Sequence, residues 1–306
     1  MINWQLWINK KRGWSGATAN SRLTVICFFL IVTLSLFYGQ ANAQRSGQSK
    51  IKQWEILGDT LMSQQRFGEA IKVFTKIIDA TGLKEKSDFN ALYKRAISYY
   101  YTEGKEDFAL ADIDKFIKEF PYVPQSHILR ALIYRIKDDA PGQLEDLNIA
   151  IGFQPANAGL LKWRAELLLD SKEYAKAKKD AESAILLRDD SESETYLAFA
   201  YFNLDHPDSA LMAINKAIEL DYTYLPAYIY AGSFCLQEDE FELALKYLNL
   251  GLRVDPDNTT VLFYKGMALV ELERTDEGCR CLNKAFYQGH DDASGYIEQY
   301  CYKIED

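Results

Sequence analysis

The residue types that most often do chemistry are few in this sequence, and they are scattered. Its three histidines, His127, His206 and His290, lie far apart, and none has cysteine or carboxylate neighbours at the spacing of a metal site. His290 is followed by Asp291 and Asp292, but one histidine beside two acids is more typical of a polar turn than of a ligand set. The sequence therefore predicts no metal site.

The motifs of the common enzyme classes are also missing. The sequence has no phosphate-binding loop, no dinucleotide glycine pattern, no G-x-S-x-G and no H-E-x-x-H. Carboxylates are many, but in stretches such as Lys172–Asp180 they are mixed with lysines, as on a solvated helix face. We therefore predict a protein that is not an enzyme and has no cofactor.

The cysteines allow one disulfide near the C-terminus. Cys279 and Cys281 lie two residues apart on a predicted helix, so they point to different sides and should not pair with each other. Either one could reach Cys301 if the last helix folds back on them. The alternative is that these residues and Cys235 are buried free thiols that act as small hydrophobic groups.

Residues 1–43 have the features of a secretory signal peptide. Four basic residues and no acid occur there, a continuous apolar run covers residues 23–38, and Ala41-Asn42-Ala43 follows. Cleavage after Ala43 would place the protein in the periplasm or outside the cell. The apolar run is short for a membrane span of about 20 residues, but an uncleaved anchor is the alternative.

The charge of the chain is acidic. Loss of the four positive charges in residues 1–43 would take the net charge from −9 to −13. Such a protein repels phosphate backbones and anionic lipid heads, so we expect no nucleic-acid partner, and contact with a membrane only if the N-terminal segment is uncleaved. A partner with a basic patch would be attracted, although plain solubility explains the same charge.

The elements that position these residues follow an internal repeat. A pattern of about 34 residues recurs about seven times between Ile51 and Asp292, most clearly in Leu225–Asn258. Each copy has two stretches with apolar residues at i, i+3, i+4 and i+7, which predicts two helices. Small residues such as Gly232 and Gly251 recur where helices must approach closely, and large ones such as Leu248 fill the space between neighbours.

The repeat divides the chain into regions. Residues 44–50 are polar and are predicted to form a flexible linker, residues 51–292 form the repeats, and residues 293–306 form a helix that caps the last apolar face. The copies begin at Ile51, Phe89, Pro124, Ala158, Ser191, Leu225 and Thr259. The second copy has one extra residue in its turn, around Glu103–Asp107.

The pattern resembles the tetratricopeptide repeat (TPR) family over essentially the whole chain after residue 43. In the first copy the family's W-x2-L-G and A-x3-F elements are Trp54, Leu57, Gly58, Ala70 and Phe74. The resemblance implies an all-α fold, a right-handed superhelical solenoid of about seven helix-turn-helix units with a C-terminal capping helix. It also implies a non-enzymatic protein that binds one or more proteins or peptide segments.

The resemblance further implies that the first helix of each copy lines a concave groove. The residues placed there are Tyr93, Tyr100, Ile128, Leu132, Arg135, Lys162, Glu166, Phe199, Phe202, Ile229, Ser233, Leu236, Phe263 and Met267, with Trp163, Tyr196, Tyr230 and Tyr264 at the rim. This stripe is largely aromatic and apolar, as expected of a binding surface. The alternative is that these side chains pack on one another.

One mode of binding in the family is testable on these residues. TPR domains that clamp a C-terminal carboxylate use Lys and Asn in adjacent first helices, whereas here only Lys162 is basic, with Arg135 one repeat away. We therefore expect an extended or helical apolar segment as the ligand. The predicted function is an exported protein-binding scaffold. The alternative is a structural subunit or assembly factor of an envelope complex for secretion, motility or wall synthesis, in which the convex face and edges make the contacts.

Overall fold

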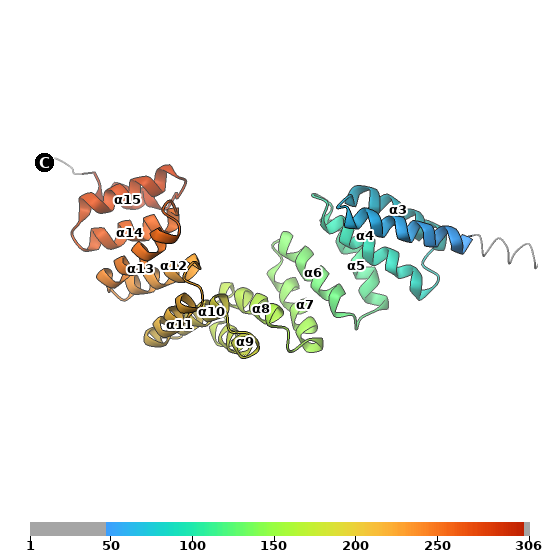
Figure 1. The fold of residues 1–306 in the computed structure, drawn as a ribbon, viewed down its shortest axis with the longest axis horizontal. Coiled ribbons are helices and arrows are strands. Elements are labelled where there is room, and N and C mark those ends of the chain that lie inside the picture. Colours follow the sequence, from blue (N-terminus) through green and yellow to red (C-terminus); the bar gives the residue numbers. More distant parts are fainter. Residues whose placement is uncertain (1–46, 303–306) are drawn as a thin grey trace, which may run out of the picture. The chain divides into compact units, whose positions relative to one another are not determined.

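The computed structural model describes residues 47–302, and every regular element in that range is a helix. Residues 47–63 are helical, and a short 3-10 turn, η2, covers Lys86–Asp88. The remaining helices are α3 (Phe67–Thr81), α4 (Phe89–Tyr100), α5 (Glu106–Glu119), α6 (Pro124–Ile136), α7 (Ala140–Phe153), α8 (Ala158–Asp170), α9 (Tyr174–Leu187), α10 (Ser191–Asn203), α11 (Pro207–Leu220), α12 (Leu225–Gln237), α13 (Phe241–Val254), α14 (Thr259–Glu271), α15 (Thr275–Tyr287) and α16 (Ala293–Tyr300) (Figure 1). The all-α architecture of consecutive helix pairs is confirmed.

The chain forms two compact units, which divide between Phe116 and Ile117. In the first, α3 packs on α4 over a core that includes Leu61, Phe74 and Ile77. A Cβ added to Gly58 would lie 2.6 Å from the Phe74 ring. Because no real side chain fits at that distance, the helix over residues 47–63 approaches α3 only where glycine stands, as the W-x2-L-G element predicts.

In the second unit each helix pair packs against the next. The first helices α8, α10, α12 and α14 contact one another in sequence, and α16 contacts α14 and α15 in the place of a further first helix. Side-chain caps mark several starts, because Asn157, Asp190 and Asn258 accept hydrogen bonds from backbone N–H groups in the first turns of α8, α10 and α14. The first helices from α4 to α14 begin at the residues where the predicted copies begin.

The turn inside each helix pair has one recurrent backbone feature. A residue with φ between 54° and 65° follows the first helix in six pairs: Gln65, Asp138, Lys172, Asp205, Asp239 and Glu273. The second copy instead uses Gly104, with φ of 69°, in the turn where the sequence predicts an extra residue. A left-handed residue reverses the chain tightly enough for the second helix to return along the first.

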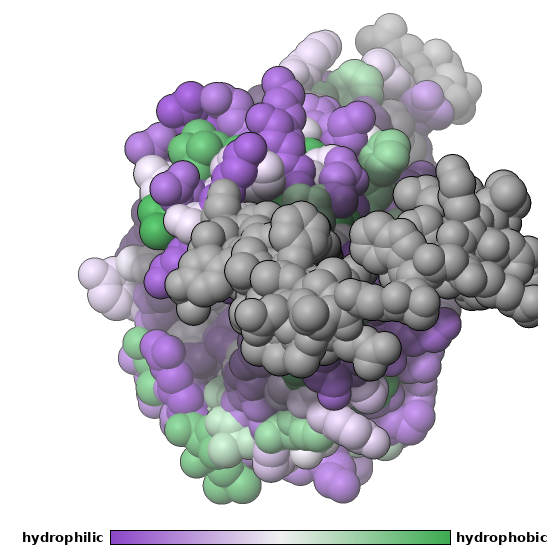
Figure 2. Space-filling model, turned by 90° about the vertical axis from the view of Figure 1, so that its right-hand side faces the viewer, coloured by the Kyte–Doolittle hydropathy of each residue, from purple (hydrophilic) through white to green (hydrophobic). Residues whose placement is uncertain are grey.

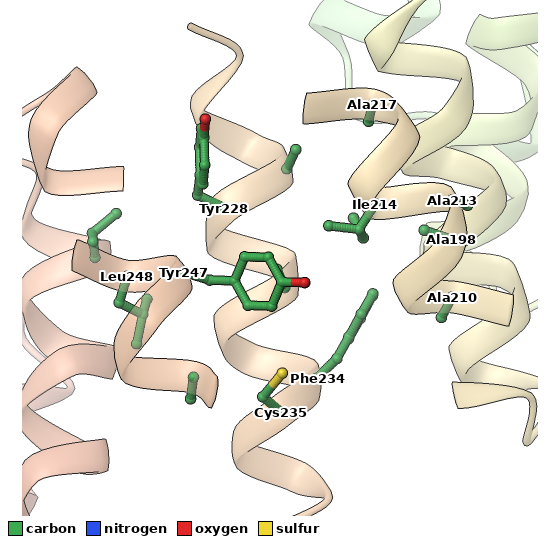
Figure 3. Packing of buried hydrophobic residues seen from close by; sticks show 14 of the residues in the cluster. Ala198, Ala210, Ala213, Ile214, Ala217, Tyr228, Phe234, Cys235, Tyr247 and Leu248 are labelled. Atoms are coloured by element: carbon green, nitrogen blue, oxygen red, sulfur yellow. The ribbon is translucent and has the colours of Figure 1, made fainter. Parts of the chain in front are cut away.

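Close packing between the helices of a pair depends on glycine and leucine. A Cβ on Gly232 would lie 2.5 Å from Leu248, and one on Gly266 would lie 2.6 Å from Leu282. Figure 3 shows Leu248 and Tyr247 of α13 beside α12, which carries Tyr228, Phe234 and Cys235. These contacts explain why small and large residues alternate at fixed positions of the repeat.

An ion pair with a buried carboxylate recurs in the second, third and fourth copies. The seventh residue of the first helix is an arginine, and the seventh residue of the second helix is an aspartate. Arg95 donates through Nε and Nη2 to Asp112 at 2.6 and 2.8 Å, and Arg164 contacts Asp180 in the same way at 2.6 and 2.7 Å. Arg130 contacts Asp146 at 2.8 Å through both atoms. The three carboxylates are buried, so each pair ties its two helices together through a two-pronged contact.

The same two positions are apolar or aromatic in later copies. Leu197 and Ala213 stand there in the fifth copy, and Ala231 and Tyr247 in the sixth. Ala213, Ala231 and Tyr247 belong to one large apolar cluster that spans α10 to α14. The Tyr247 hydroxyl donates to Asn215 Oδ1 at 2.8 Å, so its polar end also has a partner.

The two ends of the described chain can be compared with the predictions of an N-terminal linker and of a disulfide to Cys301. Residues 47–50 are helical, so the linker predicted over residues 44–50 is helical in its described part, while the predicted signal peptide lies outside the described residues. Cys279, and not Cys281, is paired with Cys301, and their Cα atoms are 5.6 Å apart. Cys235 is buried and free, and Cys281 is half-buried and free.

The surface seen in Figure 2 is mostly hydrophilic, with hydrophobic side chains in small separate groups.

Candidate protein-binding face

The first helices of the second unit form its inner side. Consecutive first helices from α8 to α14 pack directly on each other, whereas the second helices α11 and α13 are joined by the hydrogen bond from the Tyr247 hydroxyl to Asn215. The outward-facing side chains of α8, α10 and α12 therefore form a continuous surface, which we call the inner face. Its central residues are Trp163, Glu166, Tyr196, Phe199 and Tyr230, all half-buried.

The aromatic rings of the inner face pack on their neighbours and remain partly exposed. The Phe199 ring lies edge-on to Tyr230 with centroids 5.2 Å apart, and Phe202 stacks on the buried Phe234 at 4.2 Å. The rings therefore contribute to packing between copies, and part of the surface of each half-buried ring stays exposed.

Lys162 is already occupied by two carboxylates. Its ammonium donates to Asp190 at 2.9 Å and to Glu192 at 2.5 Å, and Glu192 also accepts a hydrogen bond from the Tyr196 hydroxyl at 3.2 Å. A ligand carboxylate would have to compete with both acids for this cation.

A hollow of about 270 Å³ opens between α6, α7 and α8. Its lining includes Arg135, Asp138, Trp163, Glu166 and Asp170. The Arg135 guanidinium lies 5.8 Å from the centre of the Trp163 ring and 3.9 Å from a carboxylate oxygen of Glu166. Three carboxylates and one cation line this hollow, so its net charge is negative.

The electrostatics of the inner face reflect this excess of acids. Burial raises the pKa of Glu166, and the nearby Asp170 and Glu192 raise it further, while Arg135 opposes them. Burial, followed by the field of Glu192, raises the pKa of Tyr224 to about 12. The pKa of Tyr230 is raised by burial and then by Asp170. Since each carboxylate disfavours further negative charge, this face favours cations.

Comparisons with solved structures place this arrangement in a known fold. A tetratricopeptide repeat protein from Parabacteroides merdae superposes with a TM-score of 0.65 and 11% identity, covering 82% of this chain and 99% of that chain. PilW, described as a widely conserved type IV pilus biogenesis factor, superposes with a TM-score of 0.59 and 12% identity, covering 68% of this chain and 98% of that chain. The chain has the tetratricopeptide repeat fold.

Sequence comparison agrees with the TPR fold. The human mitochondrial import receptor subunit TOM70 is 26% identical over 257 residues, which cover 79% of this chain and 40% of TOM70. Human tetratricopeptide repeat protein 6 is 23% identical over 212 residues, which cover 68% of this chain and 40% of that protein. The chain thus spans about two fifths of the length of each curated relative. No family model matches it.

The other predicted groove residues of the TPR solenoid differ in their exposure. Ile128 and Leu132 on α6, Ile229 on α12 and Met267 on α14 are half-buried. Phe263 is buried, because its ring stacks on His290 at 4.5 Å and meets the edge of Tyr296 at 5.6 Å. Phe263 is therefore a core residue under the capping helix, and its prediction as a surface residue of the groove was wrong.

Tyr93 and Tyr100 belong to the first unit. The Tyr93 ring lies 4.9 Å from Phe116, and burial raises the pKa of its hydroxyl. The Tyr100 ring meets the edge of the Tyr101 ring at 4.9 Å. Both tyrosines are half-buried, so they present part of their rings on α4.

Several polar residues of the inner face were missed by the sequence reasoning. Asp170 ends α8, and Asp190 and Tyr224 directly precede α10 and α12. Groove positions counted within a first helix do not include the residue before its start. The acidic run of Asp189, Asp190 and Glu192, which flanks the start of the fifth copy, could have indicated that acids lie on this face.

A second hollow lies on the opposite, outer side of the TPR solenoid, among α9, α10 and α11. It measures about 620 Å³, and its lining includes Ile185, Leu186, Leu197, Tyr201 and Met212. Leu186 and Met212 are 88% and 74% exposed. Among the described residues, no helix is long and apolar enough to cross a membrane, and no group of three or more metal-ligating side chains is present.

Proposed function

We propose that this TPR protein is a non-enzymatic scaffold that holds a segment of a partner protein against its inner face. The observation that carries the proposal is the set of half-exposed rings, Trp163, Tyr196, Phe199 and Tyr230, on contiguous first helices. Such rings bury much apolar area and lose little conformational freedom on binding, which is why they dominate protein interfaces. The residues carried forward from the sequence for the second unit, without Phe263, are Ile128, Leu132, Arg135, Trp163, Phe199, Phe202, Ile229 and Met267, with Lys162 held by its own acids. Tyr93 and Tyr100 stay separate binding candidates on the first unit.

The proposed location is the cell envelope. Residues 1–43 have the sequence features of a signal peptide, and residues 51–292 followed by the cap would form the exported scaffold. The likeness to PilW, a pilus biogenesis factor, and to PilF of Pseudomonas aeruginosa, with a TM-score of 0.54, 17% identity and cover of 70% of this chain and 99% of that chain, supports an envelope role. N-terminal sequencing of the protein from a Gram-negative host tests export. A mature chain starting at Gln44 supports cleavage, and an intact N-terminus supports the anchored alternative.

Site-specific photocrosslinking tests the binding face. A photoreactive residue would replace Tyr196 or Tyr230 on the inner face and, as matched controls, Leu186 or Met212 on the outer side. We expect one protein to be crosslinked from both inner positions and from neither outer position. Loss of the crosslink in a Trp163→Ala variant that keeps its helical circular dichroism would assign the contact to this face.

The outer hollow supports a second candidate, a structural subunit of an envelope complex. Leu186 and Met212 are exposed side by side with the half-buried Leu197, and an apolar hollow of this size favours contact with another protein. Crosslinks confined to positions 186 and 212 would favour this candidate over the scaffold. Crosslinks confined to the inner positions would exclude it.

A further inference from the structure

We infer that the partner segment held by the inner face is basic, with lysine or arginine residues that lie between the aromatic rings. The inference rests on the proposed function, since it names the chemistry of the ligand for the same face. It departs from the apolar ligand expected from the sequence, because the structure adds acids to the aromatic stripe. The occupant is thus a partner protein whose charge is opposite to that of the inner face.

Charge is the first argument. Two hollows use residues of α8, and their carboxylates include Asp138, Glu166, Asp170, Asp190 and Glu192, with only Arg135 and Lys162 as cations in the two linings. Lys162 bridges two of these acids, and Arg135 reaches only Glu166, at 3.9 Å. In the described chain neither Asp138 nor Asp170 has a cationic partner. A segment with two or three positive charges would complete this set.

The rings are the second argument. Trp163 already accepts the Arg135 guanidinium over its face at 5.8 Å, so a cation–ring contact is established at this surface. Tyr196 and Tyr230 lie within the fields of Glu166 and Asp170, respectively, which places rings and carboxylates on the same surface. Lysine and arginine suit such a surface, because their aliphatic stems pack along rings while their charged ends reach carboxylates.

The partial burial of the inner-face side chains is the third argument. Glu166 and Tyr196 are half-buried, and burial is the first cause of the raised pKa of each. A carboxylate that is already partly removed from water loses less hydration when a ligand covers it. The energy of its contact with a cation is also larger there than on a flat, exposed surface.

The test begins with a phage-displayed library of random peptides selected on the purified protein. Peptides that bind are then measured against three proteins by fluorescence anisotropy. These are the wild type, a Glu166→Gln and Asp170→Asn double variant, and a control in which the exposed Glu219 and Glu242 of the second helices are changed to Gln. Circular dichroism checks that each variant is folded.

We expect the selected peptides to be rich in lysine and arginine. Their affinity should fall roughly tenfold in the inner-face double variant and stay unchanged in the control, since one half-buried charge contact, at Glu166, and one exposed charge contact, at Asp170, are lost. A Glu166→Lys and Asp170→Lys variant should select acidic peptides in their place. This reversal is a gain of binding, so it does not depend on interpreting a loss.

Two failures are distinguishable. Peptides that compete with each other and are lost in Trp163→Ala, but carry no excess of basic residues, overturn the basic segment and leave the scaffold function standing. Selected peptides whose binding is unaffected by both Trp163→Ala and Tyr230→Ala show that the inner face binds no segment. That outcome overturns the proposed function and this inference together.

Discussion

Two groups of copies link their paired helices with different residues. The second to fourth copies form one group, and the fifth and sixth copies form the other. At the seventh residue of both helices, the earlier copies carry Arg95–Asp112, Arg130–Asp146 and Arg164–Asp180, each with a buried carboxylate that accepts two hydrogen bonds from its half-buried arginine. The later copies carry Leu197 with Ala213 and Ala231 with Tyr247. From the third copy to the sixth, every first helix has 13 residues and every second helix has 14, so the repeat tolerates either a polar or an apolar link at this point.

The two kinds of link contribute to stability in different ways. A buried ion pair must offset the cost of removing two charges from water, so it often contributes little net stability, but removing one partner is severe. Apolar packing contributes in proportion to buried area and depends little on salt. Arg164 and Tyr247 also reach back to Asn148 and Asn215 of the preceding second helices, each at 2.8 Å. Both kinds of link therefore hold neighbouring copies in register.

The largest expected effect is the loss of one buried charge. Asp146 is fully buried and accepts from Arg130 and from the His127 ring, so Asp146→Ala removes one hydrogen-bond acceptor from each of these two groups. We expect a loss of about 3–5 kcal/mol from the free energy of unfolding. Urea unfolding followed by circular dichroism measures it, with Asp291→Ala, an exposed site, as control. A loss below about 1 kcal/mol would show that the pair does not organise the third copy.

The corresponding change in the later copies removes packing. Leu248 is fully buried against Gly232, so Leu248→Ala leaves a cavity and should cost about 2–5 kcal/mol. Burial raises the pKa of the neighbouring Cys235 thiol to about 11, so near pH 8 it reacts slowly with iodoacetamide in the folded state. We expect Leu248→Ala to speed alkylation of Cys235 more than Asp146→Ala does, because repeats couple mainly to their neighbours. Equal rates in both variants would indicate that the whole unit unfolds together.

The disulfide is the next largest effect. It links α15 to the end of α16 across 22 residues, so Cys301→Ser frees the cap from the seventh copy. Loop-closure entropy predicts a loss of about 3 kcal/mol in the stability of this end. Hydrogen exchange should report faster exchange in α14 to α16 and no change in α6 and α7. Faster exchange spread evenly over the second unit would contradict a local role for the bridge.

The smallest expected change is the most direct test of the comparison. Arg164→Leu combined with Asp180→Ala converts the fourth copy to the residues of the fifth. Because both charges leave together, we expect a stability within about 1 kcal/mol of wild type, or higher. Each single variant should be less stable than the double variant, and urea unfolding of all three measures the coupling. A double variant as unstable as the sum of the singles would mean that the fourth copy requires the charges.

Much of the repeat architecture was predictable from the sequence, since periodicity and small-residue positions are local patterns. The starts of α6, α8, α10, α12 and α14 follow from the period and from caps such as Asn157 and Asn258. The candidate site was less predictable. Phe263 has the repeat position of a groove residue, but the final helix covers it, and a position within the repeat pattern does not indicate how the chain packs beyond the last copy.

The sequence by itself determined the helices, their pairing and the aromatic character of the first helices, because these depend on residues a few positions apart along one chain. The tertiary structure alone decided which cysteine meets Cys301, which acids occupy Lys162, and which carboxylates share the hollow beside Trp163. Those outcomes depend on the angle and distance at which one copy packs on the next. The packing of all side chains between two neighbouring copies sets that angle and distance, so no single stretch of sequence determines them.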